Sequence, residues 1–125
     1  MSYNESLVDI SVPSHADYTA DQYTFMKINS AGRAEQAGVA DKADGVLQNK
    51  PNLQDRPANI AISGVTKMVA GAAVALGANV SPDANGEAIT SVTGATVAGR
   101  ALEAAGAQGD IIAVLLNVQN NAIVL

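Results

Sequence analysis

The sequence predicts an all-β protein, a small β-barrel or β-tulip-like domain of short strands with an extended N-terminal arm. Three observations predict this class. Apolar and polar residues alternate over short segments, as they do in strands. Turn-forming residues such as Asn85-Gly86 separate these segments at intervals of roughly ten residues. Glycines interrupt the alanine-rich segments that would otherwise indicate helices, and no tandem sequence repeat is visible.

The N-terminal region, residues 1–20, is expected to form the arm. In it Val8, Ile10 and Val12 alternate with polar residues until Pro13, which predicts a half-buried strand. One interpretation makes this segment the first strand of the core. The other makes it an arm that pairs with another chain, because a segment near a terminus is usually loose unless it is held by a partner.

The next part of the chain predicts a hairpin, a short strand and an exposed loop. β-prone residues precede a turn at residues 29–32, and an apolar pair at 46–47 forms a short strand. The polar connection between Pro51 and Pro57 is expected to be an exposed loop.

The clearest strand signal lies around residue 60, and it changes parity at a glycine. Ile60 and Ile62 share one parity, whereas after Gly64 the apolar residues are Val65 and Val69. A parity change at a glycine predicts a bulge or a sharp bend, where the side chains are redirected.

Two alanine-rich segments are interpreted as strands rather than helices. From residue 74 to residue 80 the apolar side chains alternate, and Gly71 and Gly77 would each cost about 1 kcal/mol inside a helix. Residues 97–116 hold three glycines and end in the continuous apolar run 110–116, which predicts strand, loop and a final strand buried on both faces. The pattern leaves room for one helical turn around residues 102–105.

The C-terminal tail, residues 117–125, ends on an apolar tip. If they were exposed to water, Ile123, Val124 and Leu125 would form an apolar edge that is prone to association. We therefore expect either a final core strand or docking on a neighbouring subunit. The predicted organisation is therefore an arm (1–20), a barrel domain (21–116) and a tail (117–125).

Composition and charge exclude several function classes. The net charge is −5 with only seven scattered basic residues, which argues against direct nucleic-acid binding. Disulfides and thiolate metal sites are excluded because the chain has no cysteine. The longest uncharged apolar run, residues 69–80, is too short to cross a membrane, and the N-terminus does not resemble a secretory signal. We therefore expect a soluble protein that is made in the cytoplasm and does not bind membranes.

No pattern of catalytic or cofactor-binding residues is found. His15 is the sole histidine, so a zinc site lacks ligands and any catalytic triad would depend on this one residue beside Ser14 and Asp17. Four aspartates, at 17, 21, 41 and 44, do not match a calcium-loop spacing, and phosphate-binding glycine motifs are missing. We expect no enzyme activity, no cofactor and no metal.

Three segments together resemble a known family. They are "GVLQNKP" (Gly45–Pro51), "ISGVTKMVAGAAVALGANVSPDANGEAI" (Ile62–Ile89) and "VAGRALEAAGAQGDIIAVLL" (Val97–Leu116). Their order and spacing resemble the head decoration, or capsid cement, proteins of tailed bacteriophages, over about residues 8–116. The resemblance implies a homotrimeric β-barrel-like protein on the outside of the virion head. It would bridge neighbouring major capsid proteins and stabilise the expanded shell.

The residues expected to make these contacts fall into two sets. The expected capsid interface is the arm strand with Val8, Ile10 and Val12, and the expected trimer interface comprises Val65, Val69, Val74, Leu76, Ile123, Val124 and Leu125. For each residue of the second set, a place in the subunit core is an equally good interpretation. The alternative functions are a tail-tube or tail-tip protein, a host-surface or carbohydrate-binding β-module, and a hydrolase with a carboxylate pair. The shortage of aromatic residues argues against sugar binding.

Overall fold

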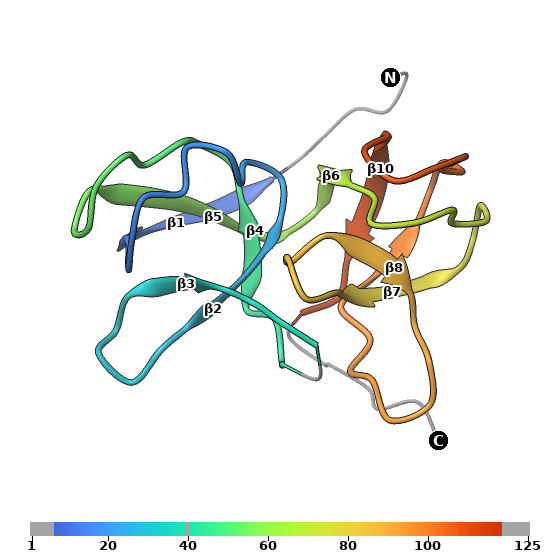
Figure 1. Cartoon of the computed structure of the whole chain (residues 1–125), viewed down its shortest axis with the longest axis horizontal. Coiled ribbons are helices and arrows are strands. Elements are labelled where there is room, and N and C mark those ends of the chain that lie inside the picture. The colour runs from blue at the N-terminus through green and yellow to red at the C-terminus, as the bar shows by residue number, and fades with distance from the viewer. Residues whose placement is uncertain (1–6, 40, 119–125) are drawn as a thin grey trace.

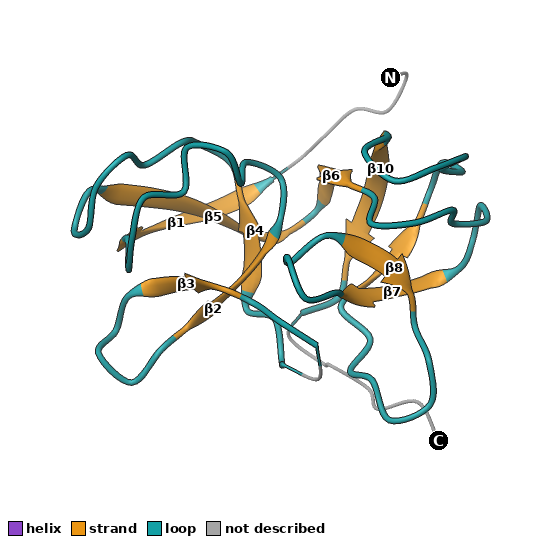
Figure 2. Cartoon of the chain, viewed as in Figure 1, coloured by secondary structure: helices purple, strands orange, loops and turns teal. Residues whose placement is uncertain are grey.

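The computed structural model describes residues 7–39 and 41–118, and within these ranges the chain forms ten β-strands and no helix (Figure 2). The strands belong to two five-stranded sheets, each built from one half of the chain (Figure 1). The first contains β1 (Val8–Pro13), β2 (Phe25–Ile28), β3 (Ala34–Gln36), β4 (Gly45–Leu47) and β5 (Pro57–Ser63). The second contains β6 (Val65–Val69), β7 (Asn79–Pro82), β8 (Ala88–Thr90), β9 (Gly99–Ala101) and β10 (Ile111–Leu116).

The all-β prediction is confirmed, and the two sheets are not closed into a barrel. Each sheet curls until its two end strands approach each other, yet they meet only at one isolated parallel bridge. The bridge joins Ser14 to Ala34 in the first sheet and Ala70 to Ala88 in the second. Because β3 and β8 are only three residues long, neither sheet has a ladder that could continue around a barrel.

The bend predicted at Gly64 is confirmed, and it connects the two sheets. Gly64 is the single residue between β5 and β6, and its φ of +102° lies in a region that favours glycine. The chain therefore leaves the first sheet and enters the second within one residue, which explains the change of parity.

The alanine-rich segments are extended, but less regular than predicted. Val74 makes only an isolated bridge to Ala105, and β7 does not begin until Asn79, because the chain turns at Gly77 with a φ of +86°. The last predicted strand is present as β10. It is not buried throughout, since Ile111 and Leu115 are 55% and 43% exposed.

The two sheets repeat one topology. The strand orders are β1-β5-β4-β2-β3 and β6-β10-β9-β7-β8, so each strand of the first sheet has a counterpart five strands later. The residue pairing repeats as well. Adding 54 to both residues of the pair Met26–Gly45 gives the pair Val80–Gly99, and the same step converts Leu47–Ile60 into Ala101–Val114. We call residues 8–62 repeat 1 and residues 65–116 repeat 2.

The turns repeat as closely as the strands. In repeat 1 the Asn29 side chain accepts hydrogen bonds from the N–H groups of Ala31 and Arg33, and Gly32 has a φ of +76°. In repeat 2 the Asp83 side chain accepts from residues 85 and 87, and Gly86 has a φ of +72°. The structure therefore contains two copies of one supersecondary unit, although the sequence shows no repeat.

The buried residues form two clusters. The smaller lies within repeat 1 and is centred on Met26, Leu47 and Ile60. The larger joins the interior of repeat 2 to one face of the first sheet, where Phe25 and Val46 are fully buried. The larger cluster therefore packs the two repeats against each other.

Candidate interaction surfaces

The described residues contain no cluster with the chemistry of a catalytic or metal site. No group of three His, Cys, Asp or Glu side chains in residues 7–39 and 41–118 could hold a metal ion. The hydroxyl of Ser14 is buried and donates to the carbonyl oxygen of Ala16 at 2.7 Å, so it is not placed as a nucleophile for His15. In the same part of the chain, no helix is long and apolar enough to cross a membrane.

The aspartates that suggested a calcium loop are engaged separately. Asp17 accepts from the hydroxyl of Thr19 at 2.6 Å, and this hydrogen bond lowers the pKa of Asp17 below its ordinary value. Asp41 accepts from the Gly38 N–H at 2.8 Å, which is the main cause of its lowered pKa. Their hydrogen bonds therefore hold loops and turns.

The predicted capsid-interface residues lie together on β1, at one edge of the first sheet. β1 pairs antiparallel with β5, and Val8 and Ile10 remain 55% and 41% exposed, while Val12 packs against the smaller cluster. No other strand of the described residues pairs along the opposite side of β1, apart from the bridge at Ser14. The strand therefore offers an open backbone edge.

The predicted trimer-interface residues do not form one patch. Val65 and Val69 are half-buried on β6, and Leu76 is 69% exposed in the loop before β7. Val74 is only 3% exposed and belongs to the larger cluster. The tip formed by Ile123, Val124 and Leu125 lies outside the described residues.

Sequence reasoning missed an exposed face on the second sheet. Val65, Leu115, Arg100 and Asn79 are successive register partners across β6, β10, β9 and β7, so they form one row on one face of the sheet. We call the last three residues of this row the open face. Leu115 is 43% exposed.

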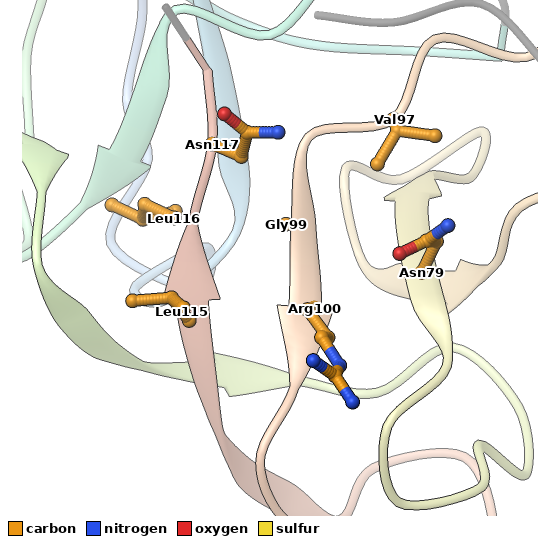
Figure 3. A pocket seen from close by; sticks show the side chains of 7 residues that line it. All are labelled: Asn79, Val97, Gly99, Arg100, Leu115, Leu116 and Asn117. Carbon is orange, nitrogen blue, oxygen red and sulfur yellow. The ribbon is translucent and has the colours of Figure 1, made fainter. Parts of the chain in front are cut away.

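A groove of about 300 Å³ opens on this face. Figure 3 shows it between β10, β9 and β7, lined by Asn79, Val97, Gly99, Arg100, Leu115, Leu116 and Asn117. The guanidinium of Arg100 donates to the carbonyl oxygen of Gly77 at 3.2 Å, beside the groove. The lining is apolar next to one cation and two amides, which is the composition of a protein contact surface.

The same face is covered in repeat 1. The row Ala61, Val46 and Phe25 is the counterpart of Leu115, Arg100 and Asn79, and all three residues are fully buried against repeat 2. One unit thus occurs twice, once with this face covered and once with it exposed. Only a structure could show this, because the corresponding side chains are chemically different.

Comparison with known proteins finds a similar fold in a phage protein. The chain resembles the N-terminal base of the head fiber gp8.5 of bacteriophage phi29, with a TM-score of 0.71 and 17% identity, over 90% of this chain and 96% of that chain. No curated protein sequence matches the chain. A family model described as phage cement protein matches residues 5–116. The sequence resemblance to capsid cement proteins is thereby confirmed, and the chain belongs to the phage cement protein family, which is a family of structural proteins and not of enzymes.

Proposed function

We propose that this protein is a head decoration protein made in the host cytoplasm. As a homotrimer it binds the outside of the phage capsid and stabilises the expanded shell by bridging major capsid proteins. Membership of the phage cement family supports a place on the head, and so does the likeness in fold to a head fiber base. The observation that carries the proposal is the open backbone edge of β1.

The open edge suits strand addition by a capsid segment. Ser14 directs its N–H to Arg56 and accepts from Asp55, on the β5 side, whereas His15 directs its N–H to Ala34 on the other side. Since backbone groups alternate along a strand, the N–H of Ser11 points away from β5. An added strand gains hydrogen bonds from this edge with little demand on side-chain identity.

A trimer would strengthen each single contact. Val65, Val69 and Leu76 keep exposed atoms and remain our candidates for contacts between copies, while the tip at residues 123–125 stays a prediction. If each subunit contacts a different capsid protein, separating two capsid proteins breaks several contacts at once. Linking contacts in this way raises the overall affinity by about 10²- to 10⁴-fold.

The test of location is to add purified protein to expanded, undecorated heads and to image the particles. We expect density on the outer surface with threefold symmetry, and heads that resist heat or chelator better than bare heads. Density on tails only, or no binding to heads at saturating concentration, would contradict the proposal.

The test of the edge is the substitution Ser11→Pro. Proline removes the outward N–H but keeps the β5 ladder, because Ser11 is exposed and lies in an extended edge strand. We expect at least a tenfold loss of head binding with little change in thermal stability, and no loss for the control Ser11→Ala. Deletion of residues 1–13 is a poorer test, since it removes β1 from the sheet. Full head occupancy by the folded Ser11→Pro variant would contradict strand addition at this edge.

A further inference from the structure

We propose that the open face of repeat 2 binds repeat 1 of a second copy of this chain, in the manner in which repeat 1 packs on repeat 2 within one chain. The inference names the contact surface of the proposed homotrimer and rests on that proposal. It is carried by the counterpart positions of the two repeats, one set buried and the other exposed.

Within one chain, the covering elements are a turn and a strand of repeat 2. The turn at residues 83–86 lies against the edge of β2, where the N–H of Phe25 donates to the carbonyl oxygen of Gly86 at 2.7 Å. β6 completes the contact, because the side-chain amide of Gln48 donates to the hydroxyl of Thr66 at 2.7 Å. These two elements define what a partner of the open face must present.

Repeat 1 presents the same two elements unoccupied. Its turn at residues 29–32 has the geometry of the turn at 83–86, and a Cβ added at Gly32 would meet no atom within 4 Å. A Cβ at Gly86 would lie 2.9 Å from the carbonyl oxygen of Phe25. On β1, the counterpart of β6, the Ile10 side chain is 41% exposed. Gly32 and Ile10 of repeat 1 therefore lie exposed at the positions that repeat 2 uses in this contact.

The chemistry of the predicted contact is complementary. Asn79 is the counterpart of Phe25, and Gly32 is the counterpart of Gly86. The Asn79 N–H of one copy is therefore expected to donate to the Gly32 carbonyl oxygen of the next copy. Leu102 and Ile10 take the places of Gln48 and Thr66. A polar pair inside the chain thus corresponds to an apolar pair between copies, in which both side chains gain from burial.

One hydrogen bond between the repeats has no counterpart, and the open face compensates for it. Inside the chain the N–H of Val69 donates to the carbonyl oxygen of Tyr23 at 3.0 Å. The counterpart of Val69 is Pro13, which has no N–H. In repeat 2 the carbonyl oxygen of Gly77, the counterpart of Tyr23, already accepts from Arg100. Pro13 therefore brings no N–H group that would need an acceptor, and the carbonyl oxygen of Gly77 keeps Arg100 as its donor when the copies meet.

The contact joins two different surfaces, so it is heterologous and closes into a ring or continues as a filament. A homotrimer is the closed form. The contact uses the Ile10 side chain, the turn at 29–32 and the outer edge of β1 at Pro13, whereas strand addition by the capsid uses the outward N–H of Ser11. The two proposals can therefore fail separately.

The experiment uses the full chain with two substitutions and two matched controls. Gly32→Asn places a side chain in the contact, and Gly94→Asn is its control, since both glycines have positive φ and open surroundings. Leu115→Asp charges the open face, and Leu53→Asp is its control at a side chain that is 54% exposed. Native mass spectrometry over a concentration series measures the trimer fraction, and thermal unfolding checks the fold. We expect Gly32→Asn and Leu115→Asp to weaken self-association at least tenfold and the controls to change it less than twofold.

A photoreactive phenylalanine analogue at position 115 gives the second readout, in mixed unlabelled and ¹⁵N-labelled chains, in solution and on heads. We expect cross-links between differently labelled copies at residues 29–32 or on β1. Cross-links at another segment, or none on fully decorated heads, would overturn this inference and leave decoration standing. If the expected cross-links form in solution but the protein does not bind to heads, decoration would be refuted and the inference would stand. A chain that stays monomeric at every concentration and binds no head would overturn both.

Discussion

Two glycines show how closely the strands approach each other in both repeats. A Cβ at Gly45 would lie 2.5 Å from the carbonyl oxygen of Ala61 and would also meet the Ile60 side chain. A Cβ at Gly99 would lie 2.7 Å from Val114 Cγ1 and 2.8 Å from the carbonyl oxygen of Leu115. Glycine is required at both places because backbone atoms cannot move aside as a flexible side chain can.

Gly45→Ala is therefore expected to destabilise the protein. Separating β4 from β5 enough for a methyl group disturbs a fully buried core, and overpacking of this kind costs about 1–3 kcal/mol. Urea unfolding monitored by circular dichroism measures the change. Gly106→Ala is the control, because its Cβ would meet only Asp110 Oδ2 at 3.6 Å. Equal stability of the two variants would contradict the close approach.

The carboxylate of Asp41 makes stability depend on pH. Its pKa is lowered from 3.8, first because the Gly38 N–H donates to it, and also because Lys27 lies 3.1 Å away. The unfolded chain therefore binds this proton more readily than the folded one. The stabilisation is complete well above pH 3.8 and is lost as the pH falls through the lowered folded pKa.

Asp41→Asn tests this linkage. We expect the variant to be less stable than the wild type at pH 7 by a few tenths to about 1 kcal/mol, since the pair is partly exposed. The difference should shrink in acid, as the pH falls from 3.8 through the lowered folded pKa and the wild-type carboxyl becomes protonated. Urea unfolding at both pH values provides the measurement. An equal loss at both would show that Asp41 acts through packing or hydrogen-bond geometry rather than charge.

At the scale of elements, the two turns with the same geometry have different surroundings. The turn at 29–32 is exposed, whereas the turn at 83–86 packs on β2 through the bond from Phe25 to Gly86. Asn29→Ala and Asp83→Ala each remove two side-chain hydrogen bonds to backbone N–H groups. Asn29→Ala also removes the donation of the Asn29 amide to Glu35 Oε1 at 3.1 Å, but only the turn at 83–86 carries a contact between the repeats.

We expect Asn29→Ala to cost about 1 kcal/mol and Asp83→Ala clearly more, because movement of the second turn also breaks the contact between repeats. Chemical denaturation of the two variants in parallel measures this difference. If both substitutions cost the same, the turn at 83–86 contributes nothing beyond its own hydrogen bonds, and the packing described at Phe25 would need revision.

Sequence patterns predicted the elements whose signals are local. The alternation in β1, the parity change at Gly64 and the apolar run of β10 each follow from side-chain direction along an extended chain. The helix alternative for residues 97–116 fails for the reason expected, since glycines support close strand contacts and turns there. Whether the sheets close into a barrel could not be predicted, because closure depends on how far a ladder extends and the pattern of a single strand does not contain this information.

The repeat and the open face were beyond sequence reasoning. Paired positions need the same backbone, not the same side chain. Tyr23 with a φ of +66° corresponds to Gly77 with a φ of +86°, and Asp55 at +67° corresponds to Gly109 at +93°. Few paired positions keep the same residue, so no repeat is visible in the letters. The open face was missed because its counterpart row in repeat 1 is apolar and buried.

At the scale of the whole molecule, the larger cluster makes the repeats depend on each other. It joins Phe25, Val46 and Ala61 of repeat 1 to the interior of repeat 2, including Met68 and Val114. A repeat separated from its neighbour would expose this apolar surface to water. The chain should therefore unfold as one cooperative unit, as small single domains usually do.

Phe25→Leu tests this cooperativity. Phe25 belongs to the larger cluster and is completely buried at the contact between the repeats. We expect a loss of about 1–1.5 kcal/mol, because leucine leaves part of the aromatic volume empty. Native-state hydrogen exchange should then show equal losses of protection in β5 of the first sheet and β10 of the second, since both exchange through global unfolding. The control Ile28→Leu changes an exposed position of the same strand and should leave the protection of both strands unchanged.

A loss of protection confined to the first sheet would mean that the repeats unfold separately. In that case the contact between them is weak within one chain, and its use between copies would lose its main support.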